Sequence, residues 1–90
     1  MVKHLNITIT GKVQRVGFRF LSLQMAYEYG VKGNVKNVNH NTVYIEAEGD
    51  EESLVQFLKW AKKGPPGSEI KDFKVEEGEI KKYKAFDIIK

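Results

Sequence analysis

Apolar and polar residues alternate along residues 4–10, with Leu5, Ile7 and Ile9 on one face and polar side chains on the other. A period of two is typical of a strand that is buried on one face, so we expect a half-buried strand here. The link that follows, residues 11–17, has a glycine at each end. These glycines allow the chain to turn sharply after the strand.

A helical pattern follows from Phe18 to about Tyr29, and Gly30 predicts its end. Its expected apolar face consists of Phe18, Leu21 and Met25, with Phe20, Leu23 and Tyr27 close by. A second helix is expected after Asp50, because aspartate commonly caps helix N-termini. The apolar side chains of this second helix recur at helical spacing, at Leu54, Phe57, Leu58 and Ala61.

Four further segments have the pattern of strands. Residues 31–38 and 42–49 are expected to form a hairpin around three residues, Asn39, His40 and Asn41, since asparagine tolerates the positive φ of tight turns. The sequence Gly64-Pro65-Pro66-Gly67 ends the second helix in a rigid loop. Strands near 70–77 and 83–89 follow, separated by a turn near Gly78, with Phe73 and Val75 inward and Phe86 and Ile88 on one face.

The order strand, helix, strand, strand, helix, strand, strand predicts an α+β protein. Its simplest packing is a ferredoxin-like sandwich, with two helices on one face of a mostly antiparallel sheet of four to five strands. We expect residues 1–90 to form a single domain, because ninety residues supply one modest core. No linker, repeat or low-complexity tract divides the chain.

Composition excludes several kinds of chemistry. The chain has no cysteine, which rules out disulfides, cysteine zinc sites and thiol catalysis. His4 and His40 lie far apart in sequence, which argues against a histidine metal cage, so we expect no metal and no cofactor. No apolar run reaches the roughly 20 residues that span a bilayer. The first residues already alternate like a strand rather than a signal peptide, and we expect a cytoplasmic monomer without nucleic-acid or membrane partners.

The basic residues are distributed unevenly. Net charge is only +3, and 13 of the 15 basic residues are lysines, whereas the two arginines, Arg15 and Arg19, lie within five residues of each other. They flank the start of the first helix, where free N–H groups and the helix dipole attract anions. The loop therefore favours a phosphate or similar dianion, although glycine and arginine also occur in such loops for geometry and solubility alone.

Asn37 is a second candidate, near the end of the second strand. Asparagine is uncommon in strands, and its carboxamide can both donate to and accept from one water molecule. From spacing alone, turn formation near the hairpin is the better explanation of this asparagine.

The residues together resemble the acylphosphatase family over essentially the whole chain. Gly11-x-Val13-Gln14-x-Val16-x-Phe18-Arg19 is similar to the first signature of the family, and Gly33-x-Val35-x-Asn37 is similar to the second. Later matches, in the same order, are Thr42-Val43, Glu46-Ala47-Glu48-Gly49, Leu54, Phe57-Leu58, Gly64-Pro65 and Phe86-x-Ile88.

This resemblance implies a fold, a reaction and a site. Acylphosphatases have the ferredoxin-like fold and hydrolyse the carboxyl–phosphate anhydride of small acyl phosphates without a metal. The matching residues imply that Arg19 holds the phosphate and that Asn37 positions the attacking water. The loop amides expected to bind the phosphate are those of Gln14, Arg15, Val16, Gly17 and Phe18.

The chain departs from the family pattern at a few positions. Arg15 stands where the family most often has glycine, and if the backbone there needs positive φ, the side chain costs of order 1 kcal/mol or more. Alternatively, Arg15 adds charge at the mouth of the loop and affects substrate choice. Asn34 replaces a residue that is usually aromatic, and Asn41 replaces the usual hairpin glycine, which asparagine can do because it visits the left-handed region.

Two non-catalytic functions compete with the enzyme hypothesis. Small sheets with two helices often bind RNA, and residues 15–20 resemble an aromatic RNA-binding motif, but they enter a helix rather than a central strand. The strand that should carry the aromatics contains Glu46 and Glu48, which repel phosphate. The other alternative is an inactive or regulatory member of the same fold.

Overall fold

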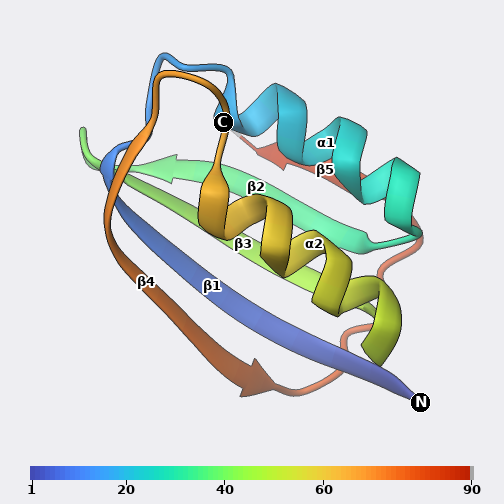
Figure 1. The fold of residues 1–90 in the computed structure, drawn as a ribbon. Coiled ribbons are helices and arrows are strands. Elements are labelled where there is room, and N and C mark those ends of the chain that lie inside the picture. The colour runs from blue at the N-terminus through green and yellow to red at the C-terminus, as the bar shows by residue number, and fades with distance from the viewer. Residues whose placement is uncertain (90) are drawn as a thin grey trace.

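The computed structural model describes residues 1–89, which form seven regular elements (Figure 1). In chain order these are β1 (Val2–Lys12), α1 (Phe18–Tyr29), β2 (Lys32–Val38), β3 (Thr42–Asp50), α2 (Glu51–Lys63), β4 (Glu69–Gly78) and β5 (Phe86–Ile89). The predicted order of helices and strands is confirmed. The last strand is shorter than predicted and begins at Phe86 rather than near residue 83.

The strands form one five-stranded sheet in the order β4-β1-β3-β2-β5. All neighbouring pairs are antiparallel except β2 and β5, which run parallel. Both helices cover the same face of this mixed sheet (Figure 1). The predicted ferredoxin-like α+β architecture is therefore confirmed.

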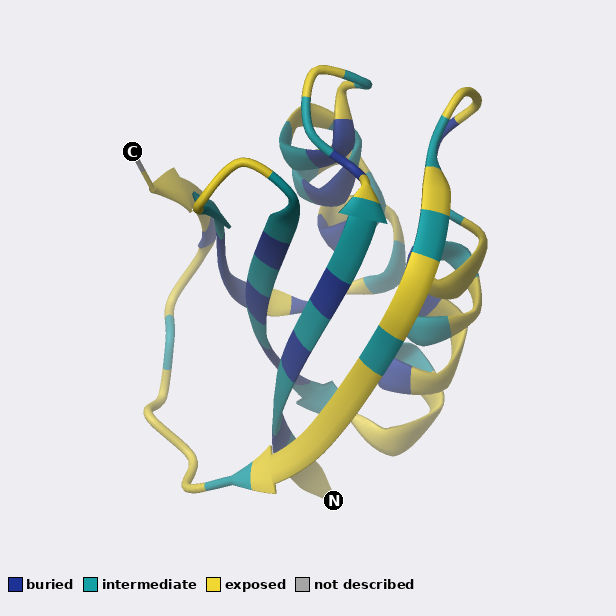
Figure 2. Cartoon of the chain, turned by 90° about the vertical axis from the view of Figure 1, so that its left-hand side faces the viewer, coloured by how far each residue is buried: buried dark blue, intermediate teal, exposed yellow. Residues whose placement is uncertain are grey.

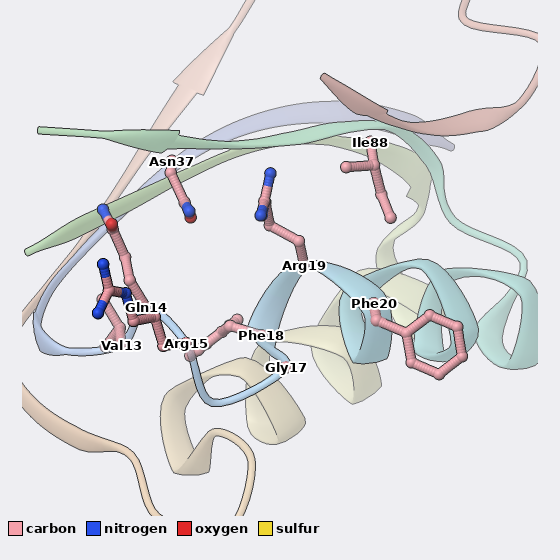
Figure 3. Close-up of a pocket in the computed structure, with 9 residues that line it drawn as sticks. All are labelled: Val13, Gln14, Arg15, Gly17, Phe18, Arg19, Phe20, Asn37 and Ile88. Carbon is pink, nitrogen blue, oxygen red and sulfur yellow. The ribbon is translucent and has the colours of Figure 1, made fainter. Parts of the chain in front are cut away.

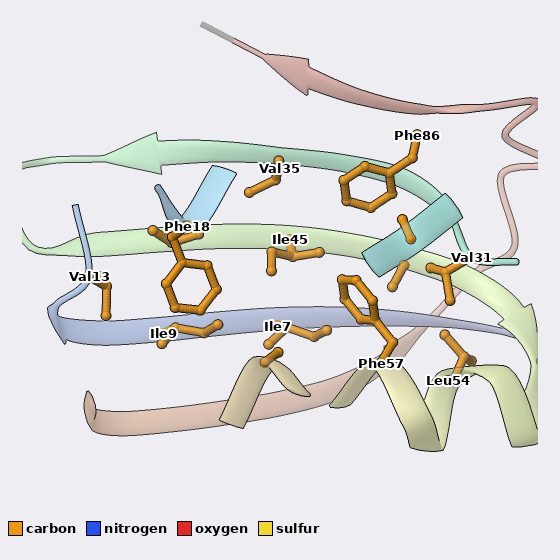
Figure 4. Packing of buried hydrophobic residues seen from close by; sticks show 14 residues of the cluster. Ile7, Ile9, Val13, Phe18, Val31, Val35, Ile45, Leu54, Phe57 and Phe86 are labelled. Carbon is orange, nitrogen blue, oxygen red and sulfur yellow. The ribbon is translucent and has the colours of Figure 1, made fainter. Parts of the chain in front are cut away.

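The core fills the space between the helices and the sheet (Figure 4). Ile7 and Ile9 of β1 and Ile45 of β3 are completely buried beneath the helices. Aromatic rings pack between the helices and the sheet: Phe57 of α2 contacts Phe86 of β5, with ring centroids 6.0 Å apart. Burying such side chains stabilises the fold by about 1.5–3 kcal/mol each.

The buried face of α1 is not the one that the large apolar residues predicted. The fully buried residues are Phe18, Ser22 and Ala26, whereas Phe20 and Tyr27 are exposed to 58% and 72%. Leu21 and Met25 are only partly buried beside this line. Small side chains let the helix backbone lie close to the sheet, so the line of closest approach runs through Ser22 and Ala26 and the bulky residues flank it.

Phe73 and Val75 of β4 pair with Ile9 and Ile7 and so face the helix side as predicted, but Val75 is still 40% exposed. Strand β4 lies at the edge of the sheet, and Figure 2 shows it largely exposed along its length. At an edge, alternation does not ensure burial, because the covering helices lie over the central strands.

The hairpin between β2 and β3 also differs in detail from the prediction, because the positive φ occurs at Asn39 (59°) and not at Asn41.

The helix-free face of the sheet is crossed by residues 79–85, which the sequence did not predict (Figure 2). The buried carboxylate of Glu48 accepts hydrogen bonds from the backbone N–H groups of Lys81 and Tyr83 and lies 2.7 Å from Nδ1 of His4. Glu46 accepts from Lys81 Nζ at 2.7 Å and from the Tyr83 hydroxyl at 2.9 Å. These two glutamates therefore fasten the segment that leads into β5.

Burial alone would raise the pKa of Glu48, but hydrogen bonds from Lys81, His4 and Tyr83 outweigh it and hold the pKa below its ordinary value of 4.5. The pKa of Glu46 is lowered in the same way, because donation from Lys81 and Tyr83 exceeds the effect of burial. A carboxylate whose pKa is depressed by folding stabilises the folded state above its unfolded pKa. That contribution is lost as pH falls through the folded value.

We expect the free energy of unfolding to decrease as pH falls below about 4.5, in part because Glu48 must take up a proton. Glu48→Gln removes this carboxylate and should flatten the dependence as pH falls below the ordinary value of 4.5. Urea unfolding across this range measures the slope. The matched control is Glu76→Gln on the exposed strand β4, which should keep the wild-type slope; an unchanged slope in Glu48→Gln would contradict the assignment.

Candidate active site

The loop between β1 and α1 is anchored in the core at both ends. Val13 is completely buried, and Phe18 is 2% exposed with its ring 5.4 Å from Trp60 in an edge-on contact. Val16, in the middle of the loop, also packs against the core. These apolar contacts fix the path of the backbone, so the loop geometry does not depend on a ligand.

The start of α1 leaves backbone donors without partners. Gly17 occupies the N-cap position with φ of 80°, and no side chain caps the helix. Within residues 1–89, no backbone N–H of residues 14–18 donates to another backbone carbonyl. Free N–H groups at a helix N-terminus, together with the helix dipole, form an anion-binding site. The predicted loop amides are thus available to a ligand.

A cleft of about 400 Å³ opens beside this loop (Figure 3). It brings together six of the seven predicted site residues, which are Gln14, Arg15, Gly17, Phe18, Arg19 and Asn37. The seventh, Val16, does not line the cleft with its side chain. Figure 3 shows the Arg19 guanidinium and the Asn37 carboxamide facing the same space from α1 and β2. None of the lining residues is acidic.

Gln14 has a structural contact that the sequence did not reveal. Its side-chain Nε2 donates to the carbonyl oxygens of Thr42 at 2.9 Å and Asn39 at 3.0 Å, with that of Val38 at 3.4 Å. The side chain therefore ties the loop to the end of the β2–β3 hairpin. Only the main-chain N–H of Gln14 remains free for a ligand.

The position of Asn37 depends on the close pairing of β2 with β3. Gly33 has φ of 143°, and a Cβ there would lie 1.8 Å from the carbonyl oxygen of Glu46. No other residue fits so near a backbone oxygen. This glycine of the second motif thus allows the register that pairs Asn37 with Val43 and directs Asn37 toward the loop.

The structure adds three residues to the cleft, Val13, Phe20 and Ile88. Phe20 follows Arg19 directly and is exposed, so it lines the cleft rather than the core. Ile88 lies opposite Val35 through the parallel pairing of β2 with β5. Element order alone did not predict that pairing, so no signal in the sequence placed Ile88 at the site.

Arg15 has φ of 62°, in the left-handed region that favours glycine. The departure from the family pattern therefore occurs at a position that needs positive φ, and the arginine costs about 1–2 kcal/mol in backbone strain. Among the salt bridges of residues 1–89, none involves Arg15 or Arg19. Neither guanidinium group therefore has a carboxylate partner within this range.

Two features are absent from residues 1–89, a cluster of metal ligands and a membrane-spanning helix. No three histidine, aspartate or glutamate side chains converge as a metal site requires. Neither helix in this range has the length and apolar character needed to cross a membrane.

Comparisons with known proteins agree with the fold. The sequence profile of the family Acylphosphatase matches residues 5–88. An acylphosphatase of Archaeoglobus fulgidus is 42% identical over 93% of this chain and 94% of its own length. An acylphosphatase of Bacillus licheniformis is 46% identical over 91% and 92%. The crystal structure of acylphosphatase from Bacillus subtilis superposes with a TM-score of 0.93 at 34% identity, covering 100% of both chains.

The class of protein follows from these findings: it is a small hydrolase of α+β fold that acts on acyl phosphates. Within that class, the chain belongs to the acylphosphatase family.

We expect Arg15→Gly to raise the free energy of unfolding by about 0.5–1 kcal/mol, because relief of strain exceeds the entropy that glycine adds to the unfolded chain. Urea denaturation of both proteins measures the difference. Asn39→Gly is the matched control, since Asn39 also has positive φ but asparagine tolerates it better, and its gain should be smaller. A loss of stability in Arg15→Gly would show that contacts of the arginine side chain outweigh the strain.

Proposed function

We propose that this chain hydrolyses acyl phosphates by in-line attack of a water molecule, with Arg19 and the loop amides holding the phosphoryl group and Asn37 holding the water. No metal ion takes part. One observation carries the proposal: an unpaired guanidinium, a run of free amides and a carboxamide line one cleft that has no acidic residue. Such a cleft suits a doubly negative group.

The loop and Arg19 provide the electrostatic stabilisation that phosphoryl transfer needs. In the transition state, negative charge spreads over the three equatorial oxygens of the phosphoryl group. Fixed N–H donors and a guanidinium stabilise this charge without reorganising, because the core already holds the loop in place. Arginine suits this task because its planar fork forms two parallel hydrogen bonds to phosphate oxygens.

Asn37 supplies position rather than basicity. Its carboxamide can accept one hydrogen bond from water and donate another, which aims the oxygen at phosphorus. The water oxygen forms a bond to phosphorus while the bond from phosphorus to the acyl oxygen breaks. The products are a carboxylate and inorganic phosphate. Since a carboxylate is a good leaving group, the reaction does not require a strong general acid.

The proposed catalytic unit is one copy of the chain, folded as a single domain. Every residue that lines the cleft comes from β2, β5, α1 or the loop before α1 of the same chain. The RNA-binding alternative is disfavoured by the helix-free face. There Glu46 and Glu48 place two carboxylates on β3, where an RNA-binding sheet needs aromatic and basic side chains.

Arg19→Ala should remove both activity and phosphate affinity, because the phosphoryl group loses its charged ligand. A charge-assisted hydrogen bond contributes about 1.5–3 kcal/mol, so inhibition by inorganic phosphate should weaken at least tenfold. Phosphate release from benzoyl phosphate and competitive inhibition by phosphate measure the two effects. Lys63→Ala, at the C-terminal end of α2 and outside the lining of the cleft, is the control for loss of one positive charge. Turnover of the Arg19 variant near the wild-type rate would refute the role.

Asn37→Ala should reduce kcat about 100-fold or more and leave phosphate inhibition nearly unchanged, since the water loses its position but the anion keeps its ligands. Steady-state kinetics with the same substrate, with and without EDTA, give both quantities. EDTA should not alter the wild-type rate. Asn41→Ala serves as the matched control because this asparagine belongs to the same hairpin but does not line the cleft. A wild-type kcat in Asn37→Ala would exclude water positioning by this residue.

A further inference from the structure

We propose that the side chain of Arg15 binds a second anionic group, carried on the acyl portion of the substrate. The enzyme then selects acyl phosphates whose acyl group is itself negatively charged. This inference rests on the proposed function, because it takes the phosphoryl group to be bound by Arg19 and the loop amides. It adds the substrate class that the same cleft prefers.

The charge balance of the cleft is the first observation. Two guanidinium groups line it, and no carboxylate of residues 1–89 pairs with either. Several lysines of the chain do have partners, as in the pairs Lys3–Glu51 and Lys81–Glu46. A cleft lined by one sign of charge concentrates ligands of the opposite sign. The phosphoryl group engages one guanidinium and leaves the other available.

The backbone at Arg15 is the second observation. A residue with positive φ and a long side chain is strained, and such strain at a ligand site is often retained for function. Arg15 and Arg19 are the only arginines of the chain, and the remaining positively charged side chains are lysines. An arginine at a strained position therefore points to a task that needs the planar guanidinium, which binds a carboxylate or phosphate through two hydrogen bonds.

The arrangement of the cleft separates the two arginines. Figure 3 shows the Arg19 guanidinium between Asn37 and Ile88, while the Arg15 side chain lies beside Gln14, on the other side of Asn37. The Arg15 side chain is exposed and has no carboxylate partner among residues 1–89, so it is free to meet an anion carried on the acyl group.

Phe20 and Ile88 oppose this preference. Both are exposed apolar residues of the same cleft, and an acyl group resting on them would gain from being uncharged. The preference between charged and uncharged acyl groups thus reports which part of the cleft the acyl group contacts.

The test compares benzoyl phosphate with 4-carboxybenzoyl phosphate, which differ only in a remote carboxylate. We expect the wild-type enzyme to show a kcat/KM about tenfold higher for the carboxylated substrate, the effect of one charge-assisted contact. Arg15→Gln should bring the ratio of the two values close to one, and Arg15→Lys should retain part of the preference. Lys12→Gln is the matched control, because Lys12 is an exposed cation three residues away that does not line the cleft, and it should keep the wild-type ratio.

A ratio that is the same in wild type and Arg15→Gln overturns the inference. An equal loss for both substrates would do so as well, since Arg15 would then contact the phosphoryl group itself. Failure of the wild-type enzyme to hydrolyse benzoyl phosphate would instead overturn the proposed function. In that case, calorimetric binding of benzylphosphonate and 4-carboxybenzylphosphonate still decides the role of Arg15, because the carboxylated ligand must bind tighter to wild type and lose that advantage in Arg15→Gln.

Discussion

The burial of Val13 and Phe18 on either side of a short loop is the constraint on which the rest of the site depends. Each side chain fills a place in the core, so the backbone between them has little freedom. The N–H groups of that backbone have no backbone partners within residues 1–89. Arg19 follows one residue after the second anchor, and its direction is set by the same contact. Core packing and anion binding are thus two results of one arrangement.

The other side of the cleft is held by different means. Gly33 permits β2 to approach β3 closely, and the Gln14 side chain joins the loop to the hairpin carbonyls next to Asn37. Together they fix the asparagine relative to the loop without using the catalytic groups themselves. On the helix-free face, Glu46 and Glu48 fasten residues 79–85, which deliver β5 and its Ile88 to the edge of the cleft.

Sequence reasoning failed where burial depends on neighbours rather than on pattern. The stripe of large residues on α1 predicted the buried face only in part, because Phe18 is buried but close approach to the sheet favours Ser22 and Ala26 over Leu21 and Met25. Val75 alternates correctly but lies on an edge strand that the helices do not cover. The network around His4 was invisible, since the carboxylates of Glu46 and Glu48 lie more than forty positions away and polar alternation suggested only a solvated face.

The sequence by itself determined the order of elements, the loop with its two arginines, and the two motifs that contain Arg19 and Asn37, because local periodicity and residue type carry that information. Only the tertiary structure decided that the guanidinium and the carboxamide share a cleft, that Ile88 joins them, and that Arg15 is strained. The physical reason is that sheet order and backbone angles arise from contacts between segments far apart in the chain, and the pairing of β2 with both β3 and β5 has no local signature.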